Sequence, residues 1–288
     1  MKKIRTSYNG DNLKNFTSYL ARQKNNGANF TVLSSGLSRT VILDSGIKFK
    51  FFPNDDKNRV EGVYFVNMVR SSINKYIDKH GLLDEATDTP QVQTFNPDGI
   101  ALAGQNDIIC MDLNSCYWRT ANLLGYIDDA LYKKGVDSGF KMGLLISIGA
   151  LNKLKHIDTY ENGKRVGSEI DEDYRRRYSP FYWKIISRVR DLMMTVYEKL
   201  GDDFYMWLTD CAFINPDRYD DVMKIFNEYG YPFKEYESQF TYFDGINVSW
   251  YEHKSQKMKS MPLSNRDIKS EYLTWKTINE FNKNINEN

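Results

Sequence analysis

Two aspartates, Asp112 and Asp210, stand at the ends of apolar runs with strand character, residues 107–111 and 204–209. Carboxylates brought together at the edge of a buried sheet repel each other unless a cation lies between them. Hard divalent ions such as Mg²⁺ take oxygen ligands and keep positions open for phosphate and water. This pair therefore predicts phosphoryl or nucleotidyl transfer. The alternative is that each aspartate is a turn residue or a helix cap, the commoner role of a single aspartate after a strand.

Regular elements are expected to position both carboxylates. The strand ending at Asp112 leads into a helix over about 117–126, and another helix is expected over about 141–154. The clearest helix spans about 180–200, with Ser179 as N-cap, Pro180 at the first position and Gly201 past its end. It leads into the strand that ends at Asp210. A helix over 219–229, strands over 240–243 and 245–251 and a short helix near 268–281 follow.

The first hundred residues predict a small α+β unit. A helix is expected over 12–23, a hairpin over 39–44 and 47–52 with Ser45-Gly46 as its turn, and a helix over about 60–80. The polar segment from about 83 to 105 is the best candidate for an internal boundary.

Composition limits the class of protein. Hydrophobic residues make up 41% and aromatic residues 14% of the 288 residues, which is enough for a folded core. The 39 Lys and Arg nearly cancel the 38 Asp and Glu, so any nucleic-acid surface must be a local patch. Three cysteines without CxxC spacing argue against zinc or a disulfide framework. With no signal peptide and no apolar membrane span, we expect a cytoplasmic protein that does not enter a membrane.

The segments around the two aspartates resemble motifs of family B DNA polymerases. Asp112-Leu-Asn-Ser115-Cys-Tyr117 resembles the first palm motif, Asp-x-x-Ser-Leu-Tyr-Pro-Ser, with Trp118 and Arg119 in place of the Pro-Ser. Leu208-Thr209-Asp210-Cys211 resembles the end of the third motif, Tyr-x-Asp-Thr-Asp-Ser, with leucine replacing the first aspartate. In the family, the two aspartates that are kept here are the main metal ligands.

Between these motifs, the segment from Lys141 to Gly149 resembles the second motif, Lys-x-x-x-Asn-Ser-x-Tyr-Gly, although only the lysine and the final glycine match. The resemblance covers about residues 107–259. It implies that Asp112 and Asp210 hold two Mg²⁺ (or Mn²⁺) ions, that Ser115 helps to seat the triphosphate, and that Tyr117 excludes a 2′-hydroxyl. It also implies that Lys141 contacts the incoming nucleotide.

The chain also departs from the family pattern. Only 29 residues separate Asp112 from Lys141 (141 − 112), which leaves a stub for the fingers, and only 29 follow Lys259 (288 − 259), too few for a thumb. Lys254, Lys257 and Lys259 follow Trp250-Tyr251, where family B palms place a basic strand against the primer. We expect them to contact nucleic acid. A Lys-x-Tyr motif is expected in this region and is not matched cleanly there.

The sequence thus predicts an α+β fold with a palm-like antiparallel sheet backed by helices. Residues 1–105 would form a small N-terminal α+β domain, 106–262 the palm with truncated fingers, and 263–288 a C-terminal helix. The predicted function is a minimal family B-like DNA polymerase acting on a DNA primer-template and dNTPs, with a protein partner supplying the thumb or the primer. Its size suggests a phage or mobile element, hence the host cytoplasm.

Two other functions remain open. One is a palm-derived protein that has lost catalysis and binds nucleic acid or assembles with a partner, which the short fingers and Leu208 favour. The other is a two-metal nuclease, which needs the same carboxylates without Tyr117 or Lys141.

Overall fold

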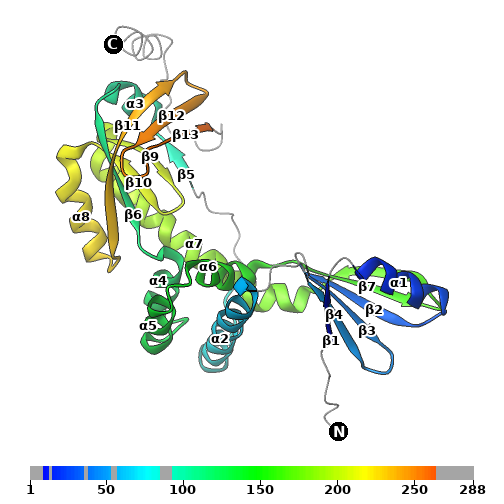
Figure 1. Cartoon of the computed structure of the whole chain (residues 1–288). Helices are drawn as coiled ribbons and strands as arrows, with labels where there is room; N and C mark the ends of the chain where they lie inside the picture. The colour runs from blue at the N-terminus through cyan, green and yellow to red at the C-terminus, as the bar shows by residue number, and fades with distance from the viewer. Residues whose placement is uncertain (1–8, 13–14, 36–37, 53–56, 85–92, 264–288) are drawn as a thin grey trace. The chain divides into compact units, whose positions relative to one another are not determined.

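The computed structural model describes residues 9–12, 15–35, 38–52, 57–84 and 93–263 (Figure 1). The chain forms two compact units, each built from two separate segments. Unit 1 comprises Met1–Ala86 and Tyr126–Tyr182, and unit 2 comprises Thr87–Gly125 and Trp183–Asn288. The predicted α+β class is confirmed. The division differs from the three consecutive segments expected from the sequence, because a segment from the middle of the chain joins the first one.

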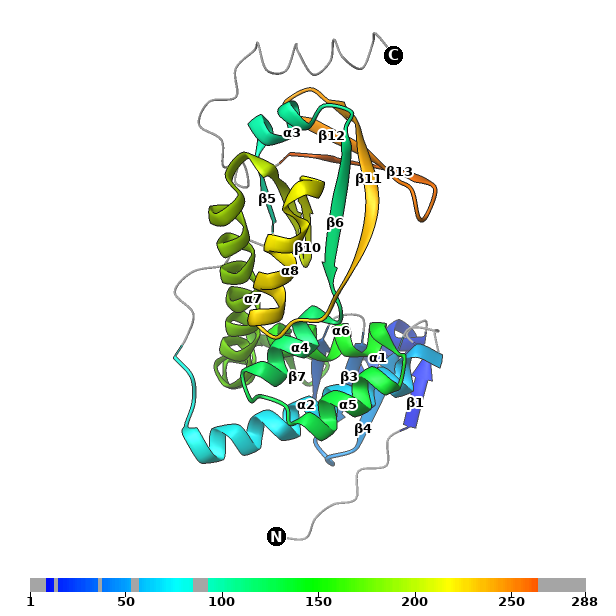
Figure 2. The same cartoon turned by 90° about the vertical axis from the view of Figure 1, so that its left-hand side faces the viewer.

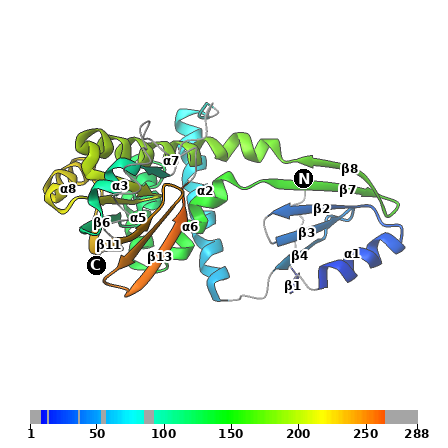
Figure 3. The ribbon, with the colours of Figure 1, turned by 90° about the horizontal axis from the view of Figure 1, so that it is seen from above.

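Unit 1 contains a six-stranded sheet with one helix on its face. In chain order its strands are β1 (Asn9–Asn12), β2 (Phe30–Ser35), β3 (Ser38–Leu43), β4 (Lys48–Phe52), β7 (Lys155–Glu161) and β8 (Lys164–Ile170). Their order across the sheet is β1-β4-β3-β2-β7-β8, antiparallel except for the parallel β1–β4 pair. Helix α1 (Phe16–Asn25) covers one face, where Phe16 and Tyr19 pack against Phe51 (Figure 3).

The hairpin turn predicted at Ser45-Gly46 is confirmed, and unit 1 contains a second hairpin, between β7 and β8. β3 and β4 are antiparallel around a turn in which Gly46 has a φ of 80°. β7 and β8 join through Asn162 and Gly163, whose φ values are 49° and 73°. Two adjacent positive φ values are typical of the tight turns that match the twist of a hairpin.

Replacing Gly163 with alanine is expected to destabilise unit 1 by about 2 kcal/mol or more. A Cβ at this position would lie 2.2 Å from the backbone oxygen of Lys24, and the positive φ adds strain. Urea unfolding would measure the change. The control is Gly167→Ala on β8, where a Cβ meets nothing within 4 Å. Equal stabilities of the two variants would contradict this prediction.

Unit 1 also contains α2 (Lys57–His80), α5 (Asp129–Asp137), α6 (Lys141–Gly149) and the first part of α7 (Glu172–Leu200). The sequence predicts no helix between residues 126 and 141, so α5 is an addition to the expected elements. Asp128 caps α5 by accepting a hydrogen bond from the Leu131 N–H (2.8 Å), and Lys133 pairs with Asp137 one turn later (2.6 Å). The helix expected over 141–154 ends at Gly149, and a 3₁₀ turn (Ala150–Asn152) follows it.

Unit 2 is built on a seven-stranded, fully antiparallel sheet. Its strands are β5 (Gln93–Phe95), β6 (Asp107–Leu113), β9 (Phe204–Leu208), β10 (Cys211–Ile214), β11 (Phe233–Phe243), β12 (Asn247–Glu252) and β13 (Lys257–Pro262). The order across the sheet is β13-β12-β11-β6-β10-β9-β5. The sequence predicted only the second half of β11 and did not predict β13 as a separate strand.

Helices cover both faces of this sheet, so the predicted antiparallel sheet backed by helices is confirmed. The second part of α7 (Glu172–Leu200) and α8 (Tyr219–Glu228) pack on one face, against Met111 and Leu113 of β6 (Figure 2). Helix α3 (Pro97–Ala103) packs on the other face, with Ile108 and Cys110 of β6. The short helix α4 (Cys116–Leu123) follows β6.

Helix α7 begins earlier than the sequence predicted. Ser179 is not its N-cap and Pro180 is not its first residue, since the helix starts at Glu172 and Pro180 lies inside it. The side chain of Asp171 caps the true start by accepting a hydrogen bond from the Tyr174 N–H (3.0 Å). The predicted end is confirmed, with Gly201 at a φ of 57°.

The helix predicted near residues 268–281 lies outside the described residues. Among the helices that the structure describes, none combines the length and the apolar character needed to cross a bilayer.

Candidate functional site

The two predicted carboxylates come together in unit 2, where β6 and β10 are adjacent antiparallel strands. Asp112 lies opposite Cys211, the residue after Asp210. The ladder continues one step further, since the Leu113 N–H donates to the backbone oxygen of Asp210 (2.9 Å). Buried apolar residues of both strands hold this register, because a shift by one residue would turn them to the other face.

The turn before Asp210 has a strained backbone. Thr209 has a φ of 53°, which is rare for a β-branched residue. Its backbone oxygen accepts a hydrogen bond from the Trp207 indole N–H (2.9 Å), and its hydroxyl donates to Asp210 (3.1 Å). Strained residues held in place by their surroundings are found more often at functional sites than elsewhere. The two hydrogen bonds of Thr209 hold this turn and the adjoining Asp210 carboxylate.

The charges of the two aspartates act on each other. The pKa of Asp210 is raised to about 6. Burial is the largest cause, and the negative charge of Asp112 also raises this pKa. A hydrogen bond from Thr209 and the positive charge of Lys234 lower it in part. Burial also raises the pKa of the Cys116 thiol well above its usual value, and the charges of Asp210 and Asp112 add to this shift. The carboxylates therefore form one site with an excess of negative charge.

Lys234 is a member of this site that the sequence analysis missed. It lies on β11 directly opposite Asp112, and its ammonium forms an ion pair with that carboxylate. The hydrogen bond to Asp112 is the largest cause of a raised Lys234 pKa. Lys234-Glu-Tyr236 has the Lys-x-Tyr spacing that was sought around Lys254, so this pattern was the available signal.

Two of the three predicted nucleic-acid-binding lysines, Lys257 and Lys259, lie on the same face of the sheet as Asp112. Residues directly opposite each other in antiparallel strands share a face. Lys257 lies opposite Glu252, and Glu252 lies opposite Ser238 on β11. Ser238 is four residues from Lys234 on the same strand, so the two side chains share a face. Lys259 pairs with Glu252 (2.5 Å). Lys254 lies in the turn between β12 and β13 and is exposed.

The predicted nucleotide-binding residues lie at two different helices, and one of them belongs to the other unit. Ser115 immediately precedes α4 in unit 2, with a left-handed backbone (φ 49°) and no side-chain hydrogen bond to the helix end. Tyr117 is half-buried on α4 and packs against the core between β6 and the helices α7 and α8. Lys141 is the exposed first residue of α6 and belongs to unit 1, whereas the carboxylates belong to unit 2.

The donor set at this site suits a hard divalent cation. Among the described residues there is no group of three or more His, Cys, Asp or Glu side chains that could hold a metal, so the pair Asp112 and Asp210 would act with backbone oxygen, phosphate and water. Burial is the main cause of the raised pKa of Asp210, and the charge of Asp112 raises this pKa by more than the ammonium of Lys234 lowers it, so part of the negative charge lacks compensation. A divalent ion would supply that compensation.

Replacing Lys234 with methionine is expected to raise the pKa of Asp210 above its present value of about 6, because the ammonium charge lowers it. Carbon-detected NMR titration of the aspartate carboxyl groups would follow the change. The control is Lys224→Met on α8, which removes an equal charge from a side chain that is 75% exposed. An unchanged Asp210 titration in the Lys234 variant would contradict the ion pair.

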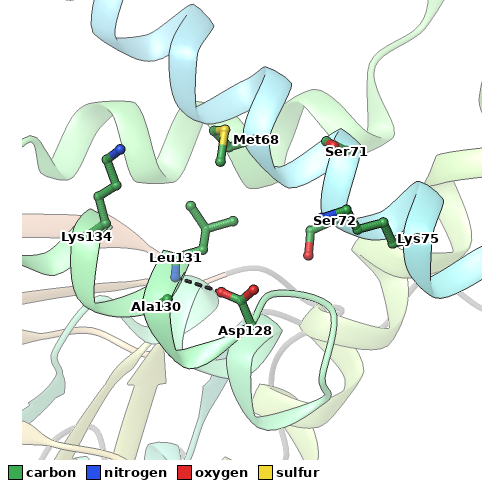
Figure 4. Close-up of a pocket in the computed structure, with 8 residues that line it drawn as sticks. All are labelled: Met68, Ser71, Ser72, Lys75, Asp128, Ala130, Leu131 and Lys134. Carbon is green, nitrogen blue, oxygen red and sulfur yellow. Dashed lines mark hydrogen bonds between the residues drawn. The ribbon is translucent and has the colours of Figure 1, made fainter.

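A separate pocket lies in unit 1 between α2 and α5, with a volume of about 230 Å³ (Figure 4). Its polar side chains come from Ser71, Ser72 and Lys75 of α2, from Asp128 just before α5 and from Lys134 within α5. Asp128 is engaged as the cap of α5, and Lys134 lies over the ring of Tyr64 (4.9 Å). The pocket contains none of the residues predicted from the sequence.

The chain was compared with models of protein families, with curated proteins and with solved structures. None of the three comparisons finds a match.

Proposed function

We propose that the chain is a minimal family B-like DNA polymerase that transfers nucleotides to a primer by a two-metal mechanism. The observation that carries the proposal is the pairing of β6 with β10, which brings Asp112 beside Asp210 and leaves the pair with uncompensated negative charge. Strain at Thr209, directly before one carboxylate, supports it. The resemblance of both segments to polymerase motifs selects nucleotidyl transfer among the reactions that two carboxylates serve.

The resemblance suggests a role for each of the predicted residues, and the ion pair suggests one for Lys234. Asp112 and Asp210 would hold divalent ions, which when bound activate a 3′-hydroxyl and neutralise a triphosphate. Lys234 neutralises Asp112 in the protein alone, and its ammonium can donate to phosphate once that carboxylate has another partner. Ser115 and Tyr117 would contact the nucleotide, and the contact of Lys141 with it stays a prediction from the sequence.

The primer-template would lie along the face of the sheet that carries Asp112. Lys257 and Lys259 share this face, and Lys254 lies at the turn between their strand and β12. Their charges would contact backbone phosphates without reading sequence. We propose that a protein partner supplies the thumb or the primer.

A catalytically inactive, palm-derived protein that binds nucleic acid or assembles with a partner is the second candidate. The ion pair of Lys234 with Asp112 favours it, because a fixed ammonium compensates one carboxylate without any metal. The residual repulsion on Asp210 favours the enzyme, because a protein with no use for a cation gains nothing from two adjacent acids.

Primer extension distinguishes the candidates. The chain would be incubated with a labelled primer-template, dNTPs and either Mg²⁺ or Mn²⁺, in parallel with reactions that lack dNTPs. Extension of the primer supports the polymerase. Shortening of the DNA without dNTPs would identify a nuclease, and DNA binding with neither reaction would identify the inactive protein.

A further inference from the structure

Four basic side chains gather in unit 1, whereas the carboxylates belong to unit 2. They are Lys50 of β4, Arg70 of α2, Lys153 just before β7 and Lys155 at its first position. We call them the basic cluster. Burial lowers the pKa of Lys153, and the positive charges of Arg70, Lys50 and Lys155 lower it further. Three separate parts of the fold therefore bring their cations within electrostatic reach of one ammonium group.

Tyr174, near the start of α7, holds two members of the basic cluster in place. The Lys155 ammonium lies 3.7 Å from the centre of its ring and the Arg70 guanidinium 5.0 Å from it. Arg70 also donates a hydrogen bond to the Tyr174 hydroxyl (2.5 Å), which itself donates to the backbone oxygen of Ala150. Arg70 and Lys155 are thus fixed by one buried aromatic ring, which keeps the positive charges together.

Lys153 lies in positive surroundings within the basic cluster. Lys155 pairs with Asp171 (3.2 Å), whereas the charges that act on Lys153 are all positive. The Nε of Arg70 is buried and has no hydrogen-bond partner in the described part of the chain. Gathering partly desolvated cations costs folding free energy, and such arrangements are concentrated at functional sites.

We propose that the basic cluster is a binding site for phosphate groups. Arg70 supplies a planar donor, Lys153 and Lys155 supply point charges, and their shared support by Tyr174 holds them in position before the ligand arrives. The phosphate comes either from the backbone of a nucleic-acid strand or from a free polyphosphate such as a nucleoside triphosphate. The site belongs to unit 1 and stands whether or not the carboxylate pair of unit 2 is catalytic.

The test uses the full chain with Asp112 and Asp210 both replaced by asparagine, in EDTA, so that no metal-dependent binding contributes. Inorganic tripolyphosphate and a fluorescent single-stranded 15-mer of thymidylate are titrated separately. Lys153→Gln is expected to weaken binding at least about fivefold at about 0.15 M salt. Each lysine–phosphate contact releases about one counterion, and at this salt concentration that release favours binding by about this factor. Lys153→Arg, which keeps the charge, is expected to retain binding.

The control is Lys164→Gln, which removes an exposed lysine from the β7–β8 hairpin of the same unit. Loss of oligonucleotide binding alone in Lys153→Gln identifies a strand phosphate, loss of tripolyphosphate binding alone identifies a free polyphosphate, and loss of both identifies one site for either. Equal affinities of the Lys153→Gln and Lys164→Gln variants for both probes would overturn the proposal.

A melting measurement separates loss of the site from loss of the fold. Lys153→Gln removes a charge that burial and three neighbouring cations disfavour, so this variant is expected to melt at or above the temperature of its parent at pH 7.5. Tripolyphosphate should raise the melting temperature of the parent and not that of the variant, because a ligand stabilises only the folded state that binds it. Equal shifts in both proteins would also contradict the proposal.

Discussion

Asparagine at Asp210 is expected to lower the rate of primer extension by about a thousandfold or more, and asparagine at Asp112 by a similar factor. Each carboxylate contributes negative charge and a ligand to the proposed metal pair, and losing several kcal/mol of transition-state stabilisation reduces a rate about tenfold for every 1.4 kcal/mol. Asparagine has nearly the same volume, so β6 and β10 keep their register.

The matched control is Asp107→Asn, at the other end of β6, where the side chain is exposed. This variant loses the same charge from the same strand and is expected to extend primers at the rate of the unmodified chain. Single-nucleotide incorporation under single-turnover conditions measures all three proteins. Incorporation by the Asp112 and Asp210 variants at the control rate would remove both residues from the reaction.

Asp210→Asn is also expected to stabilise the protein by about 2 kcal/mol at pH 7.5 and not at pH 4. The pKa of Asp210 is about 6 in the folded protein and 3.8 without its surroundings. Between these values the folded state keeps a proton that the unfolded state has released, so stability falls as pH rises from about 4 to about 6. Two pKa units correspond to about 3 kcal/mol, which partial exposure of the carboxylate to water reduces.

Thermal melting between pH 4 and pH 8 would measure this difference, with a gap of about 5 °C expected at the upper end. Adding Mg²⁺ at pH 7.5 should raise the melting temperature of the unmodified chain and leave that of Asp210→Asn nearly unchanged, because the ion binds where the charge is uncompensated. Parallel stability curves across the whole pH range would show that Asp112 and burial do not act on Asp210 as described.

Much of the carboxylate site was accessible from sequence because Asp112 and Asp210 each follow a short apolar run. Such runs predict buried strands, and the aspartates mark the points where the strands end. Lys234 was missed for the opposite reason. The first half of β11 alternates charged and aromatic residues, with Glu235 and Glu237 exposed, so it lacks a continuous apolar pattern and only its end at Phe240 was recognised.

Local signals also misplaced some boundaries. Ser179-Pro180 has the pattern of a helix start, yet α7 continues through it because Asp171 caps an earlier turn and Tyr174 packs into unit 1. The pairing of β2 with β7 joins residues about 130 positions apart. No local pattern predicts such a pair, since many strands could satisfy the same alternation.

The pairing of β2 with β7 determines how the chain can be shortened. A fragment made of residues 106–262 would keep β7 and β8 but lose β2, and six residues of β7 from Lys155 to Tyr160 would lose their partners. An unpaired strand edge that also carries Ile157 and Tyr160 is a template for self-association. Truncations that keep the carboxylate site should therefore remove residues 126–182 together with the first segment, or retain both.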